Sequence, residues 1–412
     1  MIAVLQCCAG DQRSICSAAR AHSRLQQAAV VALSSITVTI NQQQDTQYQP
    51  ESLSLLLYVV KHRQHIVSFD LEGNPFISKA TDSNILALLT KLRRLRAFNV
   101  QLKTSTLCQL QHLTRLVLHS CAVLLQPGAL AALTQLQHLA VVQSKILSDS
   151  DPENEDTAAA GTQQLLSDLQ HLQQLTHLDL ESTLPPWEYH DQPHASPEAY
   201  AALTASSRLQ HLDISNNCLP AGVWEHIFPS DRQLPHLRTL DISWVRHPAD
   251  DLPWPTEAPL PGALLASCCP GLQTLRVKGL EYPTEGLAPL QQLSSLRELV
   301  LVPRRSLRDQ MLRLWREGQV VLPKLSGLRR LSIVGAGEQS EGLLLQLTTL
   351  RQLTRLTYIG RVDGAHVQTI FGSEVRVYGA HLADILRRAP CSWCCCCAAN
   401  VSCCLAPSLC VT

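Results

Sequence analysis

Histidines that recur in one short context are the first candidates for chemistry in this chain. His112, His138, His177 and His211 each follow a Gln or Thr and precede a leucine. Neutral imidazoles on neighbouring strands about 5 Å apart could bind a metal ion. No cysteine is interleaved with them, and Thr239 holds the next equivalent position. We therefore expect a solvated row at positions 138, 177 and 211, without metal.

Cysteines gather at the C-terminal end, where eight of the 16 follow residue 390. They include one Cys-x-x-Cys, at Cys391 and Cys394, but no second pair at zinc-site spacing and no nearby histidine. Cys410 is third from the end, whereas prenylation needs a cysteine fourth from the end. Residues 389–412 are interpreted as an unstructured low-complexity tail. A palmitoylated membrane anchor is the first alternative, and a metal or redox element is the last.

Motifs of catalysis are missing from the sequence. It has no glycine-rich phosphate loop, no nucleophile elbow and no His-Glu-x-x-His. The acidic run after Asp149 resembles a calcium loop in its alternation, but Asn154 and Ala160 stand where that loop needs Gly and Glu. We predict no enzyme and no cofactor, and we interpret residues 145–165 as a solvated, mobile insertion.

A repeated leucine pattern supplies the elements that position these residues. Leu110, Leu113, Leu116, Leu118 and Cys121 combine a helix-like spacing of three with a strand-like spacing of two. Aligned on the first apolar strand residue, twelve copies begin at Ile36, Phe69, Leu95, Leu116, Leu139, Leu178, Leu212, Leu240, Leu275, Leu299, Leu331 and Leu356, between 21 and 39 residues apart. One copy alone would expose its leucines, so the copies must stack.

The fifth residue after each start is the predicted turn. It is Asn41, Asn74, Cys121 and Asn217 in the best copies, and Val245, Leu280 and Arg304 in poorer ones. With these residues the pattern resembles the leucine-rich repeat family over about residues 33–358. The resemblance implies an α/β solenoid (a horseshoe) with a parallel sheet on the concave face and helices on the convex face.

The composition agrees with a solenoid of stacked leucines and limits the classes of partner that we expect. Apolar residues make up 45% and aromatic residues 4%, which indicates an aliphatic core. The net charge of zero argues against nucleic acid as a general partner. Met1–Leu5 is too short for a secretory signal, and the cysteines form no disulfide framework. We expect a cytoplasmic protein, with a nuclear, ciliary or cytoskeletal location as the alternative.

Three segments depart from the repeat. Residues 184–197 and 246–261 are proline-rich insertions in which regular structure is not expected, and Trp187 and Trp254 either plug the solenoid edge or anchor a partner. Residues 374–388 are predicted to form a final strand and helix that cap the solenoid of residues 31–388.

Residues 1–30 are predicted to form two short helices. Asp11 is an N-cap candidate, and Ile15, Ala18, His22 and Leu25 share one helical face. This stretch resembles the last two helices of an F-box, the motif by which F-box/leucine-rich-repeat proteins dock a cullin ubiquitin-ligase adaptor. Its Leu-Pro opening and first helix are absent. The other interpretation is a cap on the first repeat.

Strand alternation predicts the binding surface, because residues between inward leucines point to the concave face. The candidate partner-binding residues are His177, Asp179, Glu181, His211, Asp213, Asp241, Arg276, Lys278, Val300, Val302, Val334 and Ile359. They form an acidic column, then two basic residues, then an apolar column. This order predicts a protein partner with a basic segment beside an apolar one.

Protein–protein recognition without catalysis is the predicted function. The resemblance implies a substrate-recognition subunit of a cullin-type ubiquitin ligase that binds its target on the concave face. The alternative is a leucine-rich-repeat scaffold of the cytoskeleton or cilium.

Overall fold

The structure is a computed structural model that describes residues 35–39, 63–72, 86–149, 157–184, 195–247, 256–279, 287–302, 316, 318–334, 346–359 and 376–379. The description is limited to the backbone at residues 35–39, 157–158, 256–257, 334, 358–359 and 376–379. Several expectations concern residues outside these ranges: the helices of residues 1–30, Trp187, Trp254, the cap helix after residue 379 and the tail of residues 389–412.

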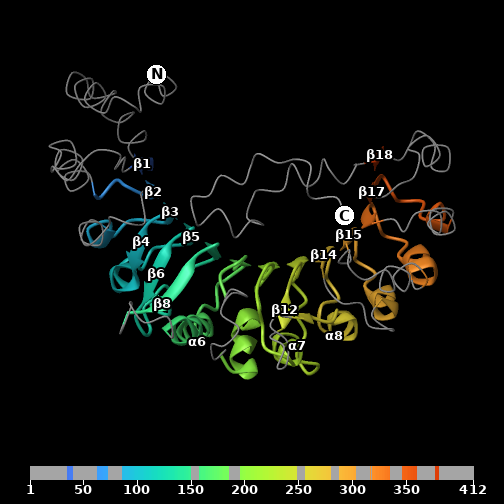
Figure 1. The fold of residues 1–412 in the computed structure, drawn as a ribbon. Coiled ribbons are helices and arrows are strands. Elements are labelled where there is room, and N and C mark those ends of the chain that lie inside the picture. Colours follow the sequence, from blue (N-terminus) through green and yellow to red (C-terminus); the bar gives the residue numbers. More distant parts are fainter. Residues whose placement is uncertain are drawn as a thin grey trace, which may run out of the picture.

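One open, curved sheet runs along the whole arc of the described chain (Figure 1). Its thirteen strands follow chain order and pair in parallel throughout. They are β1 (Ser35–Thr39), β2 (Ser68–Glu72), β3 (Arg94–Phe98), β5 (Arg115–His119), β7 (His138–Val142), β9 (His177–Asp179), β10 (His211–Asp213), β11 (Thr239–Asp241), β14 (Thr274–Lys278), β15 (Glu298–Val302), β16 (Arg330–Val334), β17 (Arg355–Ile359) and β18 (Arg376–Gly379). Twelve of these are the predicted copies, and β18 lies where a final strand is predicted.

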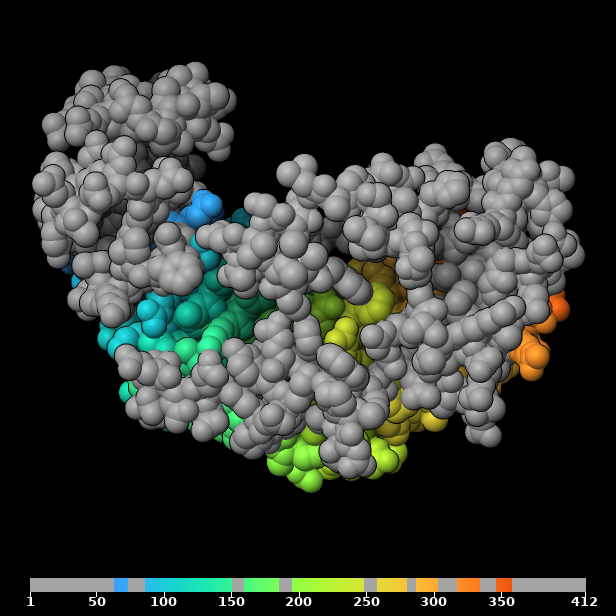
Figure 2. All heavy atoms as spheres, viewed as in Figure 1, coloured from blue at the N-terminus to red at the C-terminus, as the bar shows by residue number. Residues whose placement is uncertain are grey.

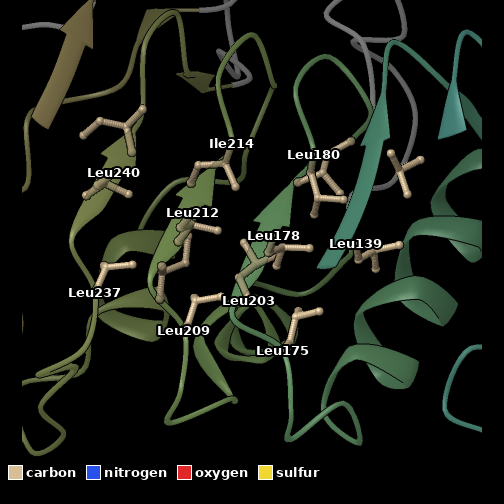
Figure 3. Close-up of a cluster of buried hydrophobic side chains, with 14 of the residues drawn as sticks. Leu139, Leu175, Leu178, Leu180, Leu203, Leu209, Leu212, Ile214, Leu237 and Leu240 are labelled. Carbon is tan, nitrogen blue, oxygen red and sulfur yellow. The ribbon is translucent and has the colours of Figure 1, made fainter. Parts of the chain in front are cut away.

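Buried leucines set the register of this sheet. Leu178 pairs with Leu139 and with Leu212, and all three are 0% exposed. Figure 3 shows leucines of successive repeats pointing into one layer behind the strands. Burying a leucine side chain stabilises the fold by about 1.5–3 kcal/mol, and a shift by one residue would turn every leucine to the solvent. The leucine spacing therefore decides which residues face the concave side.

A left-handed turn ends the strand segment at the same place in the repeats from β3 to β14. The fourth residue after the first strand leucine has φ between 49° and 67° in seven successive repeats, at Asn99, Ser120, Gln143, Ser182, Asn216, Trp244 and Gly279. Six of these residues are not glycine, although the conformation costs an ordinary residue about 1–2 kcal/mol. At Gly279 a Cβ atom would also lie 2.0 Å from the Trp244 ring, so only glycine fits there.

Polar side chains at the next position connect neighbouring repeats. The Cys121 thiol donates to the carbonyl of Ala97 at 3.4 Å, and Asn217 Nδ2 donates to the carbonyl of Leu180 at 2.9 Å. These contacts confirm Cys121 and Asn217 as turn residues. The same role falls to the hydroxyls of Ser144 and Thr183, which donate to Leu118 and Val141. In these four repeats the position is filled by a buried donor, which need not be Asn or Cys, whereas Val100 and Val245 occupy it with buried apolar side chains.

Helices and short strands cover the convex side (Figure 1). They include the helices α6 (Thr157–Leu169), α7 (Val223–Ile227) and α8 (Gly262–Cys268), and the 3-10 helices η1 (Thr104–Gln109), η2 (Pro197–Thr204), η3 (Ala288–Gln292) and η4 (Leu322–Lys324). A second parallel sheet joins β4 (Gln101–Lys103), β6 (Ala122–Leu125) and β8 (Lys145–Ser148). In the described part of the chain, no helix has both the length and the apolar character needed to cross a bilayer.

Two expectations about insertions need correction. The interpretation of residues 145–165 as one mobile insertion is wrong at both ends, because residues 145–148 form β8 and the helix α6 begins at residue 157. Leucines of α6 enter the core and hold it in place. The second proline-rich insertion also contains regular structure, since β12 (Arg246–His247) pairs antiparallel with β13 (Thr256–Glu257).

Candidate functional site

The predicted concave residues lie on successive strands of the main sheet, apart from Glu181, which follows the end of β9 by two residues. These residues form three columns that run across the strands. The first contains His177 and His211, and the second contains Asp179, Asp213 and Asp241. The third contains Glu181, Lys278 and Val302. Figure 2 shows the described repeats following one another along the arc in chain order. The structure therefore brings the acidic and histidine residues together over β9 to β11.

The apolar column is less continuous than the sequence suggests. Val300 and Val302 are half-buried on β15, and Val300 pairs with Ser332 of the next strand. Val334 and Ile359 are paired in register at the ends of β16 and β17, where the backbone alone is described.

Each aspartate of the acidic column holds its own turn with one carboxylate oxygen. Oδ1 of Asp179 accepts the backbone N–H two residues later at 3.1 Å, and Oδ1 of Asp241 does so at 3.0 Å. Oδ1 of Asp213 accepts both the N–H and the hydroxyl of Ser215, at 2.9 and 2.6 Å. The second oxygen of Asp213 has no hydrogen-bond partner among the described residues.

Three stacked carboxylates create excess negative charge over β9 to β11. Burial, and then the charge of Asp241, raise the pKa of Asp213 to about 7. Burial also raises the pKa of Asp179, and the neighbouring charge of Glu181 adds to the rise. At neutral pH this column gains stability from a positive charge placed against it.

Arginines end the acidic column on its C-terminal side. Arg276 lies 3.9 Å from Oδ2 of Asp241 and 3.4 Å from Oε1 of Glu298. The other oxygen of Glu298 contacts Arg330 at 2.5 Å. One carboxylate is therefore shared by two guanidinium groups. Glu298 and Arg330 follow the same outward alternation as the predicted residues, so the sequence contained a signal for them.

The histidine row is a stack of half-buried rings rather than a solvated ladder. The rings of His138 and His177 are 4.0 Å apart and 15° from parallel, and those of His177 and His211 are 3.9 Å apart and 3° from parallel. Burial lowers the pKa of His138 to about 4 and that of His177 to about 3, with smaller effects from Arg115 and His211 respectively. Burial also lowers the pKa of His211. The row is thus neutral at physiological pH.

This geometry does not favour a metal. The lone pair of an imidazole nitrogen lies in the ring plane, and near-parallel planes about 4 Å apart do not meet at one ion, as a tetrahedral site requires. Among the residues that the structure describes, no group of three or more His, Cys, Asp or Glu side chains is placed to hold a metal. The described cysteines, Cys108, Cys121, Cys218, Cys268 and Cys269, are all free thiols.

Comparisons with known proteins gave similarity to solved structures alone. No family model and no curated protein matches the chain. An internalin of Listeria monocytogenes is 16% identical over 72% of this chain and 83% of its own, with a TM-score of 0.39. TLR13, solved as a complex with ssRNA13, is 17% identical over 78% of this chain and 41% of its own, with a TM-score of 0.45. A leucine-rich-repeat protein of Leptospira interrogans is 14% identical over 83% of this chain and 95% of its own, with a TM-score of 0.32.

Such distant similarities say nothing about a ligand, and the fold is established by the geometry of the chain itself. Parallel strands repeat in chain order, inward leucines align from strand to strand, and left-handed turns recur at one position. The protein is a leucine-rich-repeat solenoid.

Proposed function

We propose that the protein is a non-enzymatic module that recognises another protein on its concave face. The partner presents a basic segment to the carboxylates of Asp179, Glu181, Asp213 and Asp241. Where this segment binds, the neutral imidazole stack lies beside it, and the half-buried valines of β15 offer an apolar contact further along the face.

The in-register stacking of Asp179, Asp213 and Asp241 is the observation that carries the proposal. Two unit charges about 5 Å apart repel by about 3 kcal/mol at an effective dielectric constant of about 20. The turn needs one oxygen of each aspartate, which an asparagine would supply without the charge. A cationic side chain of a partner relieves this repulsion. Binding such a side chain therefore explains why the three residues are charged, which turn formation does not explain.

Substitution of aspartate by asparagine separates the two roles of these residues. In Asp179→Asn/Asp213→Asn/Asp241→Asn the amide oxygen keeps the turn hydrogen bond and the charge is removed. We expect the variant to remain folded by circular dichroism and to lose the partners that co-purify with the wild type, as measured by quantitative mass spectrometry. Glu198→Gln/Asp231→Asn removes exposed acids outside the concave strands and serves as the control. An unchanged set of partners in the triple variant would refute the proposal.

The more specific role that we propose is a substrate-recognition subunit of a cullin-type ubiquitin ligase. It rests on the resemblance of residues 1–30 to F-box helices, and the concave face would then select the ligase target. Co-purification of the ligase adaptor with the full chain, abolished by deletion of residues 1–30, is the expected result. Co-purification of concave-face partners without the ligase adaptor would instead support the scaffold function.

A further inference from the structure

The net charge of zero conceals a strong separation of charge along the solenoid. Residues 149–257 contain 18 acidic and 4 basic side chains, whereas residues 258–361 contain 14 basic and 7 acidic ones. Among the described residues from β14 to β17, Glu298 is the one acidic side chain. The basic region therefore lies directly beside the acidic column, with the Arg276–Asp241 ion pair at the boundary.

Four exposed arginines of β15 to β17 and their flanks, Arg297, Arg329, Arg330 and Arg355, form what we call the arginine cluster. The backbone N–H groups of Arg329 and Arg330 both donate to the carbonyl of Arg297, at 2.8 and 2.9 Å. Those of Thr354 and Arg355 both donate to the carbonyl of Arg329, at 2.9 and 3.0 Å. These bonds place the four arginines at the same end of neighbouring strands.

Like charges face each other within the cluster. The backbones of Arg330 and Arg355 pair in register, so these two exposed arginines stand on neighbouring strands in the same column. Like charges directly opposite each other weaken a sheet. The nearby carboxylate of Glu298 is already shared by Arg276 and Arg330. Arg330 thus has a carboxylate partner already, and an anion bound across β15 to β17 would add a further partner beside the exposed guanidinium groups.

We propose that the arginine cluster is a subsite for a phosphorylated side chain of the protein partner. This inference rests on the proposed function, in that the partner is a protein on the concave face. Guanidinium groups match the oxygens of a phosphate monoester in pairs, through charge-assisted hydrogen bonds. Clusters of arginine are a recurring means of binding phosphorylated segments.

A peptide fits this surface better than a nucleic acid does. A polynucleotide that followed the face would bring its phosphates against Asp213 and Asp241. The described outward residues of β14 to β17 also include no aromatic side chain on which a base could stack. A peptide with a basic segment followed by a phosphorylated residue satisfies both charged regions.

Strand spacing gives the distance between the acidic column and the arginine cluster. Asp241 on β11 and Arg330 on β16 lie three strand intervals apart across the sheet, about 14 Å, and two residues out of register along it, which makes about 16 Å in all. An extended peptide covers about 3.3 Å per residue. The phosphorylated residue should therefore lie about five residues from the basic segment of the peptide.

Two synthetic fluorescein-labelled peptides test this arrangement by fluorescence anisotropy. Both carry Lys-Arg, a spacer of glycine and serine, and then a serine that is phosphorylated in one peptide alone. We expect the phosphorylated peptide to bind the full chain about tenfold more tightly than its twin. Arg330→Gln/Arg355→Gln should remove this difference. The control is Arg94→Gln/Arg115→Gln, which removes a pair of arginines in register at the same column on β3 and β5 and should preserve the difference.

The outcomes separate this inference from the proposed function. Equal binding of the two peptides overturns the phosphate subsite, as does an equal loss in both arginine variants or tighter binding of a single-stranded RNA of similar length. If the unphosphorylated peptide does not bind while the phosphorylated peptide binds through Arg330 and Arg355, the phosphate subsite is supported and the proposed role of the acidic column is refuted. If neither peptide binds, both proposals fail.

Discussion

Replacing Asn217 by alanine should weaken the solenoid at the boundary between two repeats. The side chain is 2% exposed, and its Oδ1 accepts the backbone N–H groups of Thr183 and Leu184 at 3.0 and 2.9 Å. Its Nδ2 donates to the carbonyls of Leu180, Ile214 and Ser215 at 2.9, 2.8 and 3.2 Å. The side-chain amide of Asn217 thus forms hydrogen bonds with backbone groups of two successive repeats.

The size of the effect follows from the groups left behind. Asn217→Ala removes the acceptor of two buried N–H groups, and each unsatisfied donor costs about 1–3 kcal/mol. We therefore expect a loss of about 2–6 kcal/mol in the free energy of unfolding. Because each repeat contacts mainly its neighbours, the amides of Thr183 and Leu184 should show the largest increase in hydrogen exchange.

Urea unfolding and hydrogen exchange of the full chain provide the assay. Asn216→Gly is the matched control, since Asn216 is exposed and has a φ of 57° that glycine adopts without strain. Its loss of one hydrogen bond to Glu181 should change stability by less than about 1 kcal/mol. An Asn217→Ala protein as stable as the control would refute this account of the turn.

Other substitutions test the turn and the titrating residues. Gly279→Ala should cost at least about 1–2 kcal/mol in a thermal or urea unfolding experiment, because the left-handed backbone disfavours alanine and its Cβ meets Trp244; an unchanged protein would contradict the close approach of the Trp244 ring to this turn. Asp213 has a raised folded-state pKa of about 7, so its contribution to stability is lost as pH rises from about 4 to 7. In urea unfolding, the stability of Asp213→Asn relative to the wild type should therefore increase over this pH range. Because Asp213 loses its proton over the same range, binding of a basic peptide should tighten as pH rises through 7. An affinity that does not change with pH would contradict the proposed role of the acidic column. His138 and His177 have lowered folded-state pKa values of about 4 and 3, so stability should fall as pH drops below about 6.5, and His177→Gln should reduce this acid sensitivity.

The strands and the faces could be predicted because leucine spacing alone determines them. Leu212 and Leu240 must both point inward, so Asp213 and Asp241 must both point outward. The turn was harder, because a prediction that seeks Asn or Cys overlooks the equivalent hydroxyl of Ser144.

Contacts across strands could not be predicted from single positions. The alternation places His177 in a row, but ring stacking and burial depend on the packing of its neighbours. The sharing of Glu298 by two arginines depends on how far long side chains reach over the sheet. The strand at residues 145–148 was missed because the acidic run that follows it dominates the local composition.

The constant length of the strand-and-turn segment has a practical consequence. In the seven repeats from β3 to β14 the starts lie 21 to 39 residues apart, yet the left-handed residue follows the first strand leucine by four in each of them. Chain length therefore varies in the connections that return over the outer side, and not on the inner surface. Epitope tags or fluorescent labels inserted into those connections should leave ligand capture intact, whereas one residue added between Leu212 and Asn216 should abolish it.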